Sequence, residues 1–292
     1  MLYTIENPHL RAIVSEAGAE LQSLQSPDGT EYLWQGDPSY WPDRALNIFP
    51  YVARLTEGRY QLDGRMYSLP IHGFAPRARF SLAYRSKTSL TLTLCDNAET
   101  YAQYPRHFIF SVRYQLIDAL LQITYQVENT DTRDLYFGLG GHPGFRLPLE
   151  AGLAFSDYRL LFSSCCQPRR IGFTSNHFLD GTTSPFPLVD NVSLPLTHEL
   201  FHHDAVVLEN TARQVFLGSP KGTKGVTISF PSFPYLGIWH VPYTEAPYVC
   251  IEPWSSLPAT AGKTSILEAQ KDLIHLKPSH IYKNLWSICC HW

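Results

Sequence analysis

The feature that most constrains the fold is a series of short runs rich in β-branched and aromatic residues, which are typical of β-strands. They are Ala12–Val14, Phe80–Tyr84, Leu90–Leu94, Phe108–Leu116, Leu121–Val127, Val226–Phe230 and Tyr248–Ile251. Turn-forming residues separate the runs, and Asp28-Gly29 and Asp63-Gly64 each suit a hairpin turn. Because many short strands at close spacing are typical of a sandwich or barrel, the sequence predicts an all-β fold.

Helical signals are few along the chain. It contains 22 prolines, which are too many for long helices but compatible with loops and strand edges. One short helix is predicted over Ala98–Tyr104. No internal repeat, low-complexity tract or linker divides the sequence, and a β-sandwich of this size can form one domain. We therefore expect a single domain over residues 1–292.

Composition and charge disfavour several classes of protein. With 13% aromatic and 17% charged residues, the sequence resembles neither a disordered chain nor a coiled coil. A formal net charge of −3 provides no basic footprint for nucleic acid, so the expected partner is a neutral, polar small molecule. No apolar run reaches the ~18 residues of a membrane-spanning helix.

The first residues and the cysteines bear on the compartment. The N-terminal stretch lacks the basic and apolar regions of a signal peptide. Four of the six cysteines form two adjacent pairs, which is not the pattern of a disulfide framework. We expect free thiols and a cytoplasmic protein.

Four local clusters combine a titratable residue with glycine, proline and aromatic residues, a composition that can hold a side chain at a defined place in a loop. They are Phe49–Arg54, Ile71–Pro76, Gly140–Phe145 and Cys250–Trp254. Each alone has an ordinary explanation, because a loop histidine is usually structural and a lone carboxylate is usually solvated. The combination of all four is more informative than any one.

The residue inventory tests several chemistries. The adjacent His202 and His203 would face opposite sides of a strand and no HExxH is present, so no metal is expected. The chain has no GxSxG elbow and no glycine-rich phosphate cradle. A glycosidase needs two opposed carboxylates. Glu252 could be one and Asp204, Asp43 or Glu245 the other, but the sequence shows no pairing. A histidine and a glutamate remain, and such a pair suits reversible proton transfer near neutral pH.

Motifs along most of the chain match one family. They are Ala17–Leu21, Glu31–Pro38, Tyr40-Trp41, Ile48–Pro50, His72–Phe74, Tyr104-Pro105, Gly140–Phe145, Tyr235–Trp239 and Cys250–Trp254. Together they resemble the aldose 1-epimerase (galactose mutarotase) family, and most closely its LacX-like branch, over roughly residues 1–275. The resemblance implies a large antiparallel β-supersandwich.

The resemblance also implies roles for five residues. Glu252 matches the base that takes the proton from the C1 hydroxyl of the sugar, and His142 matches the acid that protonates the ring oxygen. His72 matches a second histidine that forms a hydrogen bond near that oxygen. Arg54 and Asp204 match residues that contact the sugar. One acid and one base suffice to open and close the ring, so no cofactor is expected.

The chemistry sets two further expectations. Because both groups act on one sugar, we expect His142 and Glu252 on opposite sides of one small cavity. Aromatic residues can stack on the apolar face of a pyranose, although core packing is an equal explanation for each. The aromatic candidates are Trp34, Phe74 and Trp239.

The sequence departs from the family pattern at four places. Ala75-Pro76 follows Phe74 where a basic or small residue is common. Ala53 stands where glycine often precedes the arginine, and His240 follows Trp239 where threonine or serine is usual. The segment from Leu276 to Trp292 matches no part of the pattern.

Several readings of function stay open. The favoured one is a mutarotase that interconverts the α and β anomers of a free aldohexose. A hexose-6-phosphate 1-epimerase would need an additional basic cluster, for which the candidates are Arg77, Arg79, Arg169 and Arg170. A non-catalytic sugar-binding protein would not need both His142 and Glu252. The sequence identifies neither the sugar nor the oligomeric state, monomer or homodimer.

Overall fold

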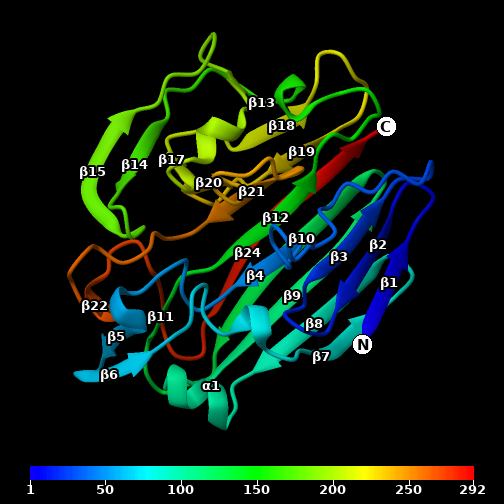
Figure 1. The fold of residues 1–292 in the computed structure, drawn as a ribbon. Coiled ribbons are helices and arrows are strands. Elements are labelled where there is room, and N and C mark those ends of the chain that lie inside the picture. The colour runs from blue at the N-terminus through cyan, green and yellow to red at the C-terminus, as the bar shows by residue number, and fades with distance from the viewer.

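The computed structural model describes all 292 residues and consists almost wholly of β-strands (Figure 1). The strands are β1 (Leu2–Glu6), β2 (Arg11–Ser15), β3 (Leu21–Gln25), β4 (Ala45–Ile48), β5 (Arg59–Leu62), β6 (Arg65–Ser68), β7 (Ser81–Arg85), β8 (Ser89–Cys95), β9 (Phe108–Ile117), β10 (Leu120–Asn129), β11 (Leu135–Phe137), β12 (Gly140–Arg146), β13 (Arg159–Phe162), β14 (Arg169–Phe173), β15 (Leu179–Pro185), β16 (Ser193–Pro195), β17 (Val206–Glu209), β18 (Gln214–Gly218), β19 (Gly225–Ser229), β20 (Tyr235–Trp239), β21 (Tyr248–Trp254), β22 (Ser265–Ile266), β23 (Ile274–Leu276) and β24 (Ile281–His291). The helices are α1 (Ala98–Gln103) and the 3-10 turns η1 (Thr56–Gly58), η2 (Ala75–Arg77), η3 (Phe155–Asp157), η4 (His198–Phe201) and η5 (Leu267–Ala269).

The prediction of an all-β chain is confirmed. Each of the seven predicted runs falls on a strand, and the one predicted helix is α1. Asn97 begins α1 because its side chain accepts hydrogen bonds from the first free backbone N–H groups of the helix. Asp63 and Gly64, with φ of 50° and 72°, form the predicted two-residue turn between β5 and β6. No helix is long and apolar enough to cross a membrane.

Two large antiparallel sheets form the body of the molecule. One has nine strands in the order β16-β13-β18-β19-β24-β10-β9-β8-β7, and the other has seven in the order β15-β14-β17-β20-β21-β12-β4. Three smaller sheets, β1-β2-β3, β22-β5-β6 and β11-β23, lie around them (Figure 1). One cluster of 64 buried residues draws on both large sheets and therefore forms a shared core.

The sheets pack face to face through alternating residues of their central strands. A Cβ at Gly141 of β12 would lie 2.6 Å from the indole of Trp286 of β24, so only glycine fits there. Beside this contact, the Tyr125 hydroxyl of β10 donates a hydrogen bond to the Asn47 side chain of β4 at 2.9 Å. Successive residues of a strand point to opposite faces. His142 therefore points away from the core, toward the outer face of the seven-stranded sheet.

The C-terminal segment is an integral part of the fold, although the sequence motifs gave it no place. β24 (red in Figure 1) is the longest strand and lies between β19 and β10 in the nine-stranded sheet. Its Trp286 is 4% exposed and lies directly beneath the strand that carries His142. The end of the chain thus supports the seven-stranded sheet from below.

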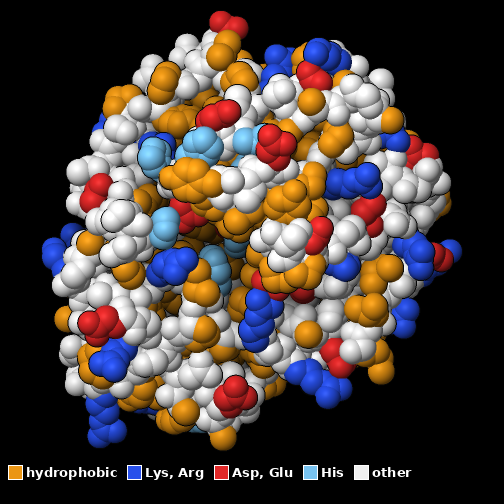
Figure 2. All heavy atoms as spheres, in the orientation of Figure 1, with side chains coloured by type: hydrophobic (Ala, Val, Ile, Leu, Met, Phe, Trp, Pro, Cys, Tyr) orange, Lys and Arg blue, Asp and Glu red, His pale blue; other side chains and the backbone are white.

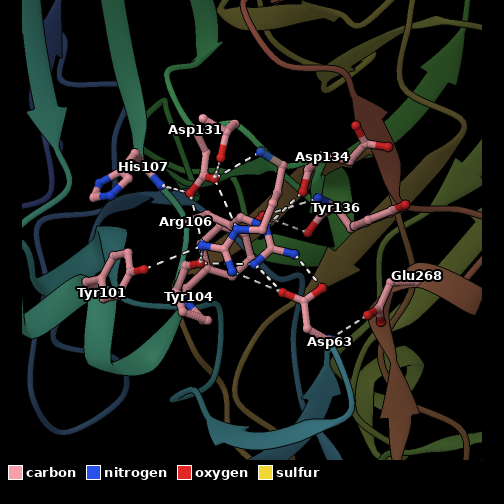
Figure 3. A network of polar contacts seen from close by, with 12 residues as sticks. Asp63, Tyr101, Tyr104, Arg106, His107, Asp131, Asp134, Tyr136 and Glu268 are labelled. Carbon is pink, nitrogen blue, oxygen red and sulfur yellow. Dashed lines mark hydrogen bonds and ion pairs between the residues drawn. The ribbon is translucent and has the colours of Figure 1, made fainter.

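A polar network fixes the β5–β6 hairpin to the start of β9 (Figure 3). The guanidinium of Arg106, which is 1% exposed, donates to both carboxylate oxygens of Asp63 and to the carbonyl of Asp134. Arg133 contacts Asp63 as well and also pairs with the buried Asp131. Every buried charge in this network has a partner, as expected of a structural cluster.

Candidate active site

A cavity of about 310 Å³ opens on the outer face of the seven-stranded sheet, at the lower end of the ~300–1,000 Å³ range of small-molecule sites. Figure 2 shows this face hollowed near its centre, with histidine side chains around the hollow. We call the pair His142 and Glu252 the floor of the cavity. We call the loop residues Arg54, His72, His177 and Asp204 its rim.

The floor stands on two neighbouring central strands. Gly140 of β12 pairs with Trp254 of β21, and Gly144 pairs with Cys250, which places His142 across from Glu252. Nε2 of His142 lies 3.3 Å from Oε2 of Glu252, and both side chains are buried. The two groups are therefore adjacent, whereas the sequence analysis had placed them on opposite sides of the cavity. Both lie on strands, although the glycine and proline content of their motifs had suggested loops.

The carboxyl group of Glu252 is enclosed by its own sheet. The indole N–H of Trp254 donates to Oε2 at 3.2 Å. On the neighbouring strand, a Cβ at Gly237 would lie 3.2 Å from the Cβ of Glu252, so the glycine leaves room for the carboxylate. Burial raises the pKa of Glu252 well above 4.5, and the negative charge of Asp204 acts in the same direction.

His142 is held between aromatic rings. Its imidazole stacks on Trp41 with ring centroids 4.8 Å apart and meets the edges of Trp239 and His72. Burial lowers the pKa of His142 to about 3, so burial favours the neutral ring. Nδ1 of this ring is buried without a hydrogen-bond partner in the protein. Because buried polar atoms are nearly always paired, an unpaired one in a cavity points to function.

His72 is fixed as a hydrogen-bond donor. The backbone N–H of Ala53 donates to Nδ1 of His72 at 3.3 Å, so the neutral ring carries its proton on Nε2. Burial lowers the pKa of His72 well below 6.5, and the nearby His142 and Arg54 add to this effect. The backbone at His72 is left-handed, with φ of 64°, and Gly73 follows because a side chain there would collide with the carbonyl of Phe49.

Asp204 is held by partners from two other segments. The indole N–H of Trp239 on β20 donates to Oδ1 at 2.6 Å, and Nδ1 of His177 lies 2.9 Å from Oδ2. His177 comes from the turn that joins β14 to β15. Three distant segments thus meet at one carboxylate on the rim.

The two arginines that line the cavity differ in their partners. Arg54 is exposed and its guanidinium forms no hydrogen bond or ion pair within the chain, so it is free to bind a ligand. The guanidinium of Arg77 donates to both oxygens of Asp43 at 2.6 and 2.7 Å. The other arginines considered for a phosphate group, Arg79, Arg169 and Arg170, do not line the cavity.

Most of the residues singled out from the sequence meet in this cavity. They are Arg54, His72, His142, Asp204, Trp239 and Glu252. Phe74 does not line the cavity: its ring packs in the core against Phe49 and Phe108, so a stacking role on the sugar is ruled out. Trp34 is likewise outside the cavity and stacks on Tyr248.

Sequence reasoning considered Asp43 only as a glycosidase carboxylate and Arg77 only as a phosphate ligand. It gave no sugar-binding or catalytic role to three further cavity residues, which are Trp41, His177 and His203. His203 directly precedes Asp204 and Trp41 is part of a family motif, so both carried a signal. His177 carried none, because it is a single histidine in an otherwise ordinary turn.

His240, one of the departures from the family pattern, lies behind the cavity wall. It is fully buried, and its Nδ1–H can donate to the carbonyl of Val241 at 2.8 Å, which leaves Nε2 to accept from Nδ1 of His198 at 3.1 Å. Burial lowers the pKa of His240 to about 4, which fits a neutral ring. The pair ties η4, just ahead of Asp204, to the strand that carries Trp239.

Comparisons with known proteins show which family the chain belongs to. The family model described as aldose 1-epimerase matches residues 1–268. The protein LacX (chromosomal) of Lactococcus lactis subsp. lactis is 32% identical over 298 residues, which cover 99% of each chain. Both comparisons match the chain from its first strand.

Solved structures extend the match to the whole chain. A galactose mutarotase related enzyme from Lactobacillus acidophilus has a TM-score of 0.95 and 34% identity, covering 100% of this chain and 98% of that one. A galactose mutarotase-like protein from Lactobacillus casei has a TM-score of 0.93 and 32% identity, covering 100% of both chains. The predicted galactose mutarotase-like fold is thereby confirmed, including β24, which lies beyond the matched family model.

Proposed function

The chain belongs to the aldose 1-epimerase family, and on that premise we propose that it interconverts the α and β anomers of a free aldohexose. The observation that carries the proposal is the floor: an imidazole and a carboxyl group 3.3 Å apart, both buried at the base of the cavity of about 310 Å³. Such a pair combines a proton donor and a proton acceptor, which are the two groups that ring opening needs.

The proton count of the floor suits this reaction. Burial favours the neutral carboxyl group and the neutral imidazole. In this state the pair holds a single titratable proton, which is on Glu252. Moving that proton from Glu252 to His142 creates a base and an acid without any exchange with solvent. The floor can thus supply the reactive form at the moment when a sugar hydroxyl and ring oxygen replace the contact between the two groups.

The steps follow from these roles. Glu252 takes the proton of the C1 hydroxyl while His142 protonates the ring oxygen, and the bond between C1 and that oxygen breaks. The open-chain aldehyde turns about the bond between C1 and C2. The same groups with reversed roles then close the ring on the other face. His72, whose Nε2–H is a donor, supports the charge that develops on the ring oxygen.

The rim would hold the sugar while the floor acts on it. Asp204 offers its remaining lone pairs to hydroxyl groups, and the free guanidinium of Arg54 offers donors. The indole of Trp239, held in place by its bond to Asp204, gives an apolar wall for the pyranose ring. These contacts favour a neutral sugar, because the other cavity arginine, Arg77, is already occupied by Asp43.

The test is anomer exchange. Purified protein is mixed with fresh α-D-galactose, α-D-glucose and glucose 6-phosphate in parallel, and mutarotation is followed by polarimetry or by NMR exchange. Faster exchange of a free hexose supports the proposal, and a preference for the 6-phosphate would favour the alternative substrate class.

The matched control is Glu252→Gln, which keeps the shape of the side chain but cannot act as a base. Sugar binding without any acceleration by either protein would point instead to a non-catalytic sugar-binding protein. The monomeric or dimeric state and the cytoplasmic location stay predictions.

A further inference from the structure

The floor has a third polar neighbour that the proposed reaction does not use. Cys250 lies on β21 two residues before Glu252, and alternate residues of a strand share a face. Its thiol is fully buried and forms no disulfide. One ligand atom from each of His142, Cys250 and Glu252 lies within 4.8 Å of the other two. The three side chains therefore converge on one point beneath the cavity.

The spacing suits a small tetrahedral cation. For Zn²⁺ with bonds of about 2.0–2.1 Å to nitrogen and oxygen, the edge of the tetrahedron between these two atoms is about 3.3 Å. Nε2 of His142 and Oε2 of Glu252 are 3.3 Å apart. The three ligand atoms lie within 4.8 Å of one another, whereas a tetrahedral zinc site would place sulfur about 3.6 Å from a nitrogen or oxygen ligand. The thiol of Cys250 would therefore have to move by about 1 Å to bind the same ion as the other two groups.

The donor set and the charge balance favour a soft or borderline metal. A thiolate, an imidazole and a carboxylate are ligands of Zn²⁺ and Cd²⁺, and three protein ligands leave a fourth position open toward the cavity. A divalent ion would displace one proton from the thiol and one from the carboxyl group. The net charge of this buried point would then be unchanged, so no uncompensated charge is buried.

The imidazole of His142 is also only weakly held by the rest of the protein. Nδ1 of His142, in a residue 7% exposed, has no hydrogen-bond partner in the protein. In addition, the contact of Nε2 with Glu252 is long for a charge-assisted hydrogen bond. The imidazole is therefore not committed to a strong internal contact that a metal would have to break.

We propose that His142, Cys250 and Glu252 form a binding site for a soft or borderline divalent cation, represented by Zn²⁺ and Cd²⁺, and that the bound ion blocks the floor. Binding converts Glu252 and His142 from proton-transfer groups into metal ligands. The ion is thus an inhibitor that competes with the sugar and not a cofactor. The inhibitory consequence rests on the proposed function, whereas the binding site does not.

The experiment uses chelator-treated, full-length protein and Cd²⁺ as the probe. Binding is followed by the ultraviolet charge-transfer band between thiolate and cadmium, and mutarotation is measured in parallel at several sugar concentrations. The key variant is Cys250→Ala, and Cys250→Ser replaces it if the smaller side chain prevents folding. The matched control is Cys290→Ala, which removes another buried thiol that lies on β24, away from the cavity.

We expect Cys250→Ala to keep its basal mutarotation and to lose sensitivity to Cd²⁺ by at least ~10-fold, because even outer partners of a metal site contribute 10–100-fold to affinity. The charge-transfer band should weaken in Cys250→Ala and in His142→Asn but not in Cys290→Ala. Equal bands and equal inhibition in the Cys250 and Cys290 variants would overturn the site. If the protein has no mutarotase activity, the band alone still decides the binding question.

Discussion

On the floor of the cavity, His142 and Glu252 stand on adjacent strands in the middle of a sheet, whereas the rim residues stand on loops from four parts of the chain. The backbone differs in the same way. Three of the four rim residues, His72, His177 and Asp204, have left-handed backbones with φ of 64°, 63° and 67°. The floor has ordinary extended strands.

This difference separates two tasks. Proton transfer needs groups held to a fraction of an ångström, and central strands provide that rigidity. Recognition needs donors and acceptors at particular places around the ring, and loops can supply them at the cost of local strain of about 1–3 kcal/mol for each left-handed residue other than glycine. We therefore expect changes on the floor, and at His72 because its donor acts on the ring oxygen, to affect kcat. Changes at the other rim residues should affect KM.

The largest effect is expected from the floor. Glu252→Gln and His142→Asn should each lower kcat by at least ~10²-fold, the low end for a general acid or base, with a smaller change in KM. Steady-state polarimetry of both variants and of the double variant measures this. The combined loss should be less than the product of the two, because the groups act as a unit. A Glu252→Gln variant with near-normal kcat would remove the floor from the mechanism.

The second prediction concerns pH. The floor acts while the pair holds one proton, and burial widens this window because it lowers the pKa of His142 to about 3 and raises that of Glu252 well above 4.5. Activity falls below the lower pKa, where His142 gains a second proton for the pair. It falls again above the upper pKa, where Glu252 loses the single proton. Separate groups with ordinary values of 4.5 and 6.5 would lose about tenfold per pH unit above 6.5.

We therefore expect the plateau of kcat/KM to extend below pH 4.5 and to be wider than the interval between pH 4.5 and 6.5, measured in buffers that contain a chelator so that no metal occupies the floor. A narrow maximum between pH 4.5 and 6.5, the ordinary values of the two groups, would show that burial does not control the pair.

The sequence predicted individual strands and turns better than it predicted which distant strands lie side by side. Most of the alternating runs were recognisable because one face of the strand is polar or exposed, and the Asp63-Gly64 turn was recognisable from its residue types. β24 was not, because its buried face includes the polar Asn284 and its outer face carries the apolar Leu285, which obscures the alternation. The adjacency of His142 and Glu252 depends on strand register across more than a hundred residues, and no local pattern encodes it.

The candidate site was predictable where a motif marked it and not elsewhere. The errors at Phe74 and His177 have physical causes. The left-handed backbone at His72 and Gly73 turns the chain so that Phe74 enters the core, although it is only two residues from a rim residue. His177 reaches the rim only because the β14–β15 turn folds toward Asp204, a long-range contact without a sequence signal.

The third prediction tests the rim. Asp204→Asn keeps the acceptor for the indole N–H of Trp239 but removes the charge that faces His177 and the sugar. KM should rise about 10-fold, in line with ~1.5 kcal/mol for a hydrogen bond to a charged group, while kcat stays near normal. The matched control is Glu209→Gln, a carboxylate on β17 that does not line the cavity. A loss of kcat as large as that of Glu252→Gln would abolish the distinction between floor and rim.

The smallest effect is expected at Ala53, which has φ of 56° and stands where the family often has glycine. A left-handed backbone costs a residue with a Cβ about 1–2 kcal/mol, and the greater freedom of glycine in the unfolded chain offsets about 0.5–1 kcal/mol of this. Ala53→Gly should therefore raise the free energy of unfolding by up to ~1.5 kcal/mol. KM should not change because both backbone contacts with His72 remain. The control is Ala78→Gly, at φ of −74°, where glycine should destabilise by about 0.5–1 kcal/mol. Urea unfolding of the two variants gives the comparison directly. If both lose stability equally, the loop at Ala53 is not strained, and the contrast between a relaxed floor and a strained rim does not hold there.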